Sequence, residues 1–252
     1  MLLLVRVARS LSATGGLPAK PAFVKPVLEK WFGPCYEDGF SEESVDAVMP
    51  LHWGIRRTEE GVKPIAAAEQ SAIDEDLRAS FGSLLEEVRS DSARFEREVF
   101  EESHGLFERP RAALALLVLC DQVSRNVHRK QAEAFSLDGL TARWSERLLD
   151  ARDDLNLHPL EVVFALLPLE HSEDPKHHKT CLFELTLLEA RASKFPEHVQ
   201  ACVAQAKQVA TEHAAVVTKF GRYPHRNDVL GRESTPDELA FLNDPSTPRW
   251  GQ

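Results

Sequence analysis

The sequence has 252 residues, of which 43% are hydrophobic and 28% are charged, a balance typical of a globular protein. Its formal net charge of −10 argues against a general nucleic-acid binder, because neutralising phosphates requires clustered Lys and Arg. No apolar run approaches the roughly 18 residues that a spanning helix needs, so we expect a soluble protein without a membrane span.

The N-terminal segment differs from the rest of the chain. The first 28 residues carry four basic residues and no acid, whereas the remainder holds 26 basic and 40 acidic residues. Residues 1–12 can form a short basic amphipathic helix with hydroxyl side chains, as in mitochondrial import segments; a disordered or packed arm is the alternative. We predict a basic N-terminal arm over residues 1–26, a helical domain over 27–242 and a C-terminal tail over 243–252.

Hydrophobic periodicity predicts helices along most of the chain. Residues 13–26 are expected to be a linker, and residues 51–64 a loop whose Trp53 fills part of a core. The expected helices cover residues 27–32, 41–48, 66–88, 92–102, 110–126, 138–149, 160–167, 176–192, 196–220 and a stretch beginning at 236. No useful segment alternates with period two, so the predicted class is all-α, and the short helix pairs are compatible with a stack of helical hairpins.

The helix that begins at Pro110 is expected to lie at the centre of the protein. Its middle, residues 112–120, is apolar on all sides, which is typical of a central helix in a bundle. Its C-terminal end carries Asp121, Arg125 and Asn126, so we expect this buried helix to place polar side chains at one of its ends.

The four cysteines are scattered and form no CxxC pair. Three of them, Cys120, Cys181 and Cys202, lie among apolar residues, and we expect reduced thiols in a core. The HExxH spacing is absent as well, and we predict neither a metal site nor a cofactor.

A dense polar turn follows the longest predicted helix. That helix ends at Phe220 and Gly221, the glycine serving as a left-handed stop. Thr235 to Glu238 then opens another helix, with Pro236 at its first position and Glu238 completing a capping box. The residues of the turn itself are Arg222, His225, Arg226, Asn227, Arg232 and Glu233.

Three motifs together carry a family resemblance. They are LCDQVSRN at residues 119–126, PLEHSED at 168–174, and FGRYPHRN at 220–227 followed by LGREST. With them, the chain resembles the uncharacterised family DUF924 over roughly residues 27–242, and this resemblance implies a tetratricopeptide-like, all-helical fold without an assigned activity. The chain departs from the usual first motif, which has Phe and Pro where this chain has Val and Ser at positions 123 and 124.

The polar residues of these motifs are the candidate site. They are Asp121, Arg125, Asn126, His171, Glu173, His213, Arg222, His225, Arg226, Asn227, Arg232 and Glu233. The arginines could bind a carboxylate or phosphate in a bidentate manner, or they could pair internally with nearby acids. The histidines could act as general acids and bases or as ligands, or could be satisfied core residues.

We therefore expect a non-catalytic accessory or interaction subunit of a larger mitochondrial assembly, a respiratory or ATP-synthase complex being favoured, whose partners are other protein subunits. The alternative is a protein or hydrolase-type enzyme that binds a small anionic ligand through the Arg and His cluster. Arginines left unpaired in an open pocket would favour the alternative, and arginines paired with acids in a sealed cluster would favour the subunit.

Overall fold

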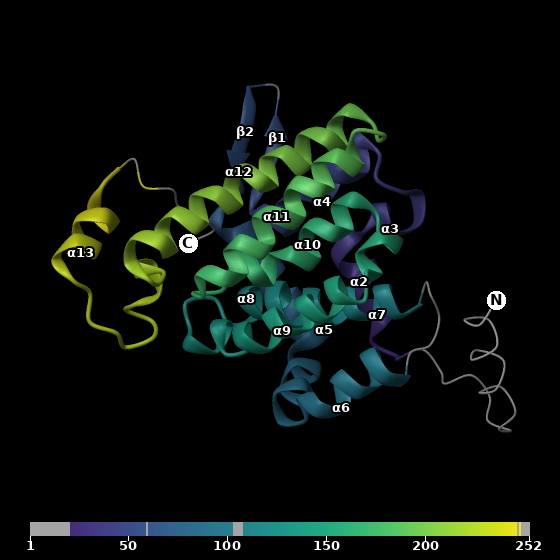
Figure 1. Ribbon diagram of the computed structural model, residues 1–252, viewed down its shortest axis with the longest axis horizontal. Coiled ribbons are helices and arrows are strands. Elements are labelled where there is room, and N and C mark those ends of the chain that lie inside the picture. The colour runs from purple at the N-terminus through teal and green to yellow at the C-terminus, as the bar shows by residue number, and fades with distance from the viewer. Residues whose placement is uncertain (1–20, 59, 103–107, 246, 248–252) are drawn as a thin grey trace, which may run out of the picture.

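The computed structural model describes residues 21–58, 60–102, 108–245 and 247, and over these the protein is mostly helical (Figure 1). The α-helices are α2 (Val24–Phe32), α3 (Pro34–Asp38), α4 (Glu42–Trp53), α5 (Ala67–Ser90), α6 (Ser92–Arg97), α7 (Glu108–Leu117), α8 (Ser124–Val127), α9 (Asp138–Asp150), α10 (Pro159–Glu170), α11 (Pro175–Ala192), α12 (Glu197–Phe220) and α13 (Pro236–Asn243). Short 3₁₀ and π turns complete them, namely η1 (Glu98–Glu102), η2 (Val118–Val123), η3 (Ala132–Phe135), η4 (Asp153–Asn156) and η5 (Pro224–Arg226).

The apolar segment predicted at the centre is indeed buried. Every side chain from 112 to 119 is fully excluded from solvent. Helix α7 carries the first part of this segment and packs against α2, α9 and α10. The chain then widens into the π-helical turn η2, in which Asp121 lies, before α8 resumes the regular helix. Such π turns inside helices are frequent at functional sites, because the extra residue re-aims the side chains around it.

The prediction of a class without strands is wrong in one place. Residues expected to be a loop form an antiparallel hairpin, β1 (Ile55–Thr58) with β2 (Gly61–Pro64). Each strand has four residues and is largely exposed, so no alternation of apolar and polar residues marks it. Trp53, expected inside the core, is 46% exposed and instead stacks one face on Phe164 at 5.6 Å between ring centroids.

Two helices continue past prolines that were expected to end them. Helix α4 runs through position 50 to Trp53, and its last turn is held because His52 Nε2 donates to the Trp31 carbonyl at 2.8 Å. Helix α10 runs through Pro168 to Glu170 and is buried along its whole length. Tertiary packing therefore outweighs the local cost of proline at both positions. The extension of α10 buries Glu170, the first acid of the PLEHSED motif.

Helices α10, α11 and α12 pack on one another, and α13 lies at the far end of α12, away from the main helical body (Figure 1). Gly221 ends α12 with a φ of 70°, as predicted. At the opposite end of the chain, Phe23 and Val24 are already buried, so the core begins within the segment expected to be a linker. The basic arm predicted over residues 1–26 lies outside the described residues, except for positions 21–26. Within the described chain, no helix is both long and apolar enough to cross a membrane.

Candidate functional site

Asp121 is the central carboxylate of the polar cluster. It is 1% exposed and accepts hydrogen bonds from three side chains: His171 Nδ1 at 2.9 Å, an Arg125 guanidinium nitrogen at 3.1 Å and the Gln122 amide at 2.5 Å. Burial alone would raise its pKa, but the neighbouring His171 and Arg125 outweigh that effect and lower it. Asp121 is therefore an ionised carboxylate at neutral pH, held by the first two motifs of the sequence.

Since an ionised carboxylate can only accept, His171 presents Nδ1–H to Asp121. Burial and then the positive charge of Arg125 lower the His171 pKa, so the imidazole is neutral at pH 7. The backbone places it there because His171 is the C-cap of α10, its own N–H bonding the Leu167 carbonyl at 2.8 Å. An Asp–His pair of this kind is a common way to hold a general base in one tautomer.

A second carboxylate, Asp138, links two arginines. Arg125 donates to its Oδ1 at 2.9 Å and Arg226 donates to its Oδ2 at 3.0 Å. Both guanidinium groups also stack on the ring of Phe135, with centroid distances of 5.3 and 4.7 Å. Asp138 is the first residue of α9, where we predicted a helix to begin, but no side chain among the described residues caps the start of this helix. The role of Asp138 is instead to neutralise two cations that would otherwise repel each other.

The polar turn is anchored by Arg232. It forms a bidentate pair with Glu173 at 2.7 and 2.9 Å, and it donates to Asn227 Oδ1 at 2.9 Å. Glu173 also accepts the backbone N–H of Tyr223 at 2.8 Å. Burial opposes ionisation of Glu173, but the hydrogen bonds from Arg232 and Tyr223 lower its pKa. The second and third motifs are thus joined by one carboxylate.

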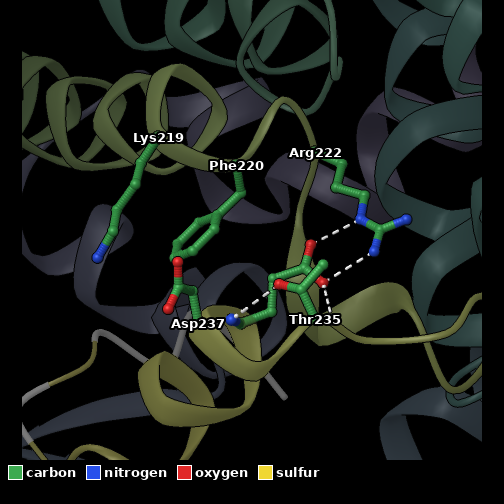
Figure 2. Close-up of a pocket in the computed structure, with 6 residues that line it drawn as sticks. Lys219, Phe220, Arg222, Thr235 and Asp237 are labelled. Carbon is green, nitrogen blue, oxygen red and sulfur yellow. Dashed lines mark hydrogen bonds and ion pairs between the residues drawn. The ribbon is translucent and has the colours of Figure 1, made fainter.

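Arg222 ties the end of α12 to the beginning of α13 (Figure 2). It donates to both oxygens of Glu238 at 2.6 and 2.8 Å, and also to the Glu233 carbonyl at 2.8 Å. Glu238 completes the predicted capping box with Thr235, so one carboxylate serves as helix cap and as ion-pair partner. A cavity of about 470 Å³ lies here and includes Lys219 among its lining residues, but the histidines lie elsewhere.

Behind the Asp121–His171 pair lies a buried acid. Glu170 is 4% exposed, and burial, then the charge of Asp121, raises its pKa to about 8. His213 Nδ1 lies 3.2 Å from it and donates to the Val209 carbonyl at 3.0 Å. Tyr223 donates its hydroxyl to the Glu170 carbonyl oxygen at 2.5 Å. A protonated Glu170 therefore stands beside an ionised Asp121, and such a split between two acids is a mark of many acid–base sites.

His225 completes the group of histidines. It is half-buried, with its ring 5.4 Å from that of Tyr223. Burial and the charges of Arg226 and Arg125 lower its pKa to about 3, so it is neutral at pH 7. Among the described residues its side chain has no hydrogen-bond partner, which distinguishes it from His171 and His213.

Nine of the twelve predicted site residues belong to this continuous network, His225 touches it only through the ring of Tyr223, and two lie outside it. Asn126 faces the other way and bonds Arg129 at 2.7 Å in a separate cluster with Asp74. The Glu233 side chain is exposed, and only its backbone carbonyl contacts Arg222. Within the residues that the structure describes, no group of three or more acidic, His or Cys side chains is arranged to hold a metal ion.

The network also contains residues that we did not predict as part of the site. Asp138 and Glu238 were interpreted only as helix starts, Glu170 only as a neutralising acid, and Tyr223 not at all. Glu170 and Tyr223 lie inside the recognised motifs, so motif membership was the available signal. Asp138 lies outside them, and nothing in the local pattern marks it.

The fold and the cluster define a mostly helical protein with a buried, ion-paired polar core at one end of its central helices. Its sequence matches the family described as "Bacterial protein of unknown function (DUF924)" over residues 27–246, and the chain belongs to that family. It is also similar to a solved protein of unknown function, ATU0120 from Agrobacterium tumefaciens. The identity is 27% and the TM-score 0.52, with 69% of this chain and 85% of that chain covered. A comparison with curated proteins gives no match.

Proposed function

We propose that this protein is a non-catalytic accessory subunit that binds other protein subunits of a larger mitochondrial assembly, with a respiratory or ATP-synthase complex favoured. The observation that carries the proposal is the pairing of the site arginines. Arg125, Arg226, Arg222 and Arg232 each donate to a carboxylate of the protein itself. Paired arginines have little to offer an anionic metabolite, because a ligand would have to displace a buried carboxylate.

In this proposal the cluster specifies the fold rather than a reaction. Its ion pairs join η2, the end of α10, the polar turn and α13, which lie far apart in the sequence. We further infer that the pairs α10–α11 and α11–α12 stack as helical hairpins in a tetratricopeptide-like manner, an arrangement that commonly presents an extended surface to partners. The basic, acid-free character of residues 1–26 supports mitochondrial delivery.

The test is the size of the endogenous protein. It would be isolated from mitochondria at gentle salt by an affinity tag, separated by size and identified with its partners by mass spectrometry. We expect migration in a large complex at fixed stoichiometry. A protein that is absent from mitochondria, or that migrates freely near its own mass of 28.2 kDa, would contradict the proposal.

A second function is favoured by one observation, the Asp121–His171 pair with its neutral imidazole. In this alternative His171 and the unbonded His225 would act on a small anionic ligand oriented by Arg125. Titration with inorganic phosphate and with acetate, monitored by thermal shift, tests it. A saturable stabilisation that is lost in His171→Gln but kept in His177→Gln would favour the ligand-binding protein over the subunit.

A further inference from the structure

Helix α11 exposes an apolar ridge on its outer face. Phe183 is 61% exposed and Leu187 is 43% exposed. Residues four apart on a helix are neighbours on one face, so the two side chains form one continuous strip. The opposite face of α11 is buried through Cys181, Leu185 and Leu188, so the helix already packs fully on the body of the protein without using this strip.

A groove runs beside the ridge. Its volume is about 450 Å³, and its lining residues come from the end of α9, the turn after it and the middle of α11. We call it the α9–α11 groove; it is lined by Glu146, Leu149, Asp150, Arg152, Thr180 and Glu184. Thr180 lies one turn from Phe183 and Glu184 lies three residues from Leu187, so helical geometry makes ridge and groove adjacent.

The charge of the groove is negative, since three acids and one arginine line it. Arg152 is shared between Glu184 and Asp154, each at 3.6 Å. Glu146 faces only His177 at 3.6 Å, and within the described part of the chain Asp150 has no ion-pair partner. Glu146 and Asp150 are four residues apart on α9, so their carboxylates stand about one helical turn apart.

We propose that the ridge and the α9–α11 groove together bind a basic amphipathic helix of a partner protein, an inference that rests on the proposed role as an interaction subunit. The partner's apolar face covers Phe183 and Leu187. Its Lys or Arg residues, spaced by four on one flank, reach Glu146 and Asp150. This is the helix-in-groove mode, in which apolar anchors supply affinity and flanking charges set orientation.

A second copy of the chain fits this surface poorly. Lys176 and Lys179 lie on α11 before the ridge, and Arg191 and Lys194 lie beyond it. In a two-fold pair with antiparallel α11 helices, the basic ends would face each other, and in a parallel pair each residue would face its own copy. Like charges meet in both arrangements, whereas a partner helix of another sequence avoids them.

The test uses the full chain and two labelled 14-residue helical peptides, one of Leu and Lys with amphipathic spacing, and one with Glu in place of every Lys. Fluorescence anisotropy measures binding of each. We expect saturable binding of the Lys peptide and at least about tenfold weaker binding of the Glu peptide, since flanking charges discriminate between partners. The double variant F183S/L187S and the double variant E146K/D150K should each weaken binding of the Lys peptide by about tenfold or more.

Matched controls alter the same residue types elsewhere: L239S on α13, and E43K/E197K at two exposed acids. Both should bind the Lys peptide as the wild type does. Equal binding of the two peptides, equal losses in variants and controls, or a dimer that F183S/L187S dissociates would each overturn the inference. If the endogenous protein migrates in a large complex but does not bind the Lys peptide, this inference is wrong and the proposed function stands. If it binds the Lys peptide but migrates near its own mass when isolated from mitochondria, the proposed function is wrong and this inference stands.

Discussion

Asp138 receives the guanidinium of Arg226 at 3.0 Å, across 88 positions of sequence, while its other oxygen holds Arg125 at 2.9 Å. Arg226 is only 5% exposed, and Asp138 is the one acid with which it forms an ion pair among the described residues. This pair connects the start of α9 to the polar turn. Loss of Arg226 would therefore leave one oxygen of Asp138 and the His171 carbonyl without their donor, although Arg125 still pairs with Asp138, and it would loosen two segments at once.

The substitution Arg226→Ala is expected to lower the free energy of unfolding by about 2–4 kcal/mol, because it removes one partner of a buried ion pair and leaves an Asp138 oxygen and the His171 carbonyl without a donor. Denaturant unfolding at pH 7 measures the change. Arg143→Ala is the control, since Arg143 is exposed and, among the residues that the structure describes, bonds only the Gly139 carbonyl. It should change stability by no more than about 0.5 kcal/mol. A cost below about 1 kcal/mol for Arg226→Ala would contradict a structural network and would favour a ligand-binding role.

The raised pKa of Glu170 predicts that the protein loses stability as the pH rises toward about 8. Its pKa is raised from 4.5 to about 8 in the folded protein, so between these values the folded state holds a proton that the unfolded chain has lost. Stability therefore falls as pH rises through this window. Between pH 6.5 and 8.5 the wild type should lose about 2 kcal/mol more than Glu170→Gln, at about 1.4 kcal/mol per pH unit over the titrating part.

Urea unfolding of both proteins at pH 6.5, 7.5 and 8.5 measures this difference. The buried histidines contribute to the pH dependence of both proteins alike, so their contributions cancel in the difference between the two proteins. An identical pH slope in wild type and Glu170→Gln would show that Glu170 is ionised in the folded protein throughout.

His225 predicts loss of stability in acid. The pKa of His225 is lowered from 6.5 to about 3 in the folded protein. Below pH 6.5 the unfolded chain therefore binds a proton that the folded protein does not bind. Stability conferred by this histidine is complete above pH 6.5 and declines as pH falls toward 3. Between pH 7 and pH 4.5 the wild type should lose about 2–3 kcal/mol more than His225→Gln, because the other buried histidines lower the stability of both proteins alike. The comparison is made within each protein between the two pH values, so any constant cost of the substitution drops out; equal losses in both proteins would refute the prediction.

The sequence predicted the helices and the composition of the cluster better than its pairing. The uninterrupted apolar run at residues 112–120 located the central helix, because a helix that is apolar on all sides is stable only when it is buried on all sides. Local patterns could not predict that α10 continues through Pro168, since tertiary packing decides that outcome. They also could not predict that Asp138 would turn from a helix start toward two arginines, because the partners come from other motifs.

Deletion of N-terminal residues tests where the helical core begins. We predicted that residues 1–26 form an arm outside the helical domain, but Phe23 and Val24 are buried. Deletion of residues 1–20 should therefore preserve the thermal midpoint, whereas deletion of residues 1–26 should lower stability by several kcal/mol, about 1.5–3 for each buried side chain lost. Circular dichroism melting of the two truncated proteins distinguishes them, and equal midpoints would show that the core begins only after residue 26.

A substitution at Gly221 should change the backbone energy without changing side-chain packing. Its φ is 70°, and a Cβ added there would meet no atom within 4 Å, so Gly221→Ala introduces only left-handed strain. We expect a loss of about 1–2 kcal/mol in the free energy of unfolding. Gly139→Ala is the matched control, because Gly139 lies in α9 with equal space around it and without a positive φ. Alanine at that position should stabilise the helix by about 0.5–1 kcal/mol. Denaturant unfolding of both variants therefore should show changes of opposite sign, and a Gly221→Ala protein as stable as the wild type would mean that the chain leaves α12 by another conformation.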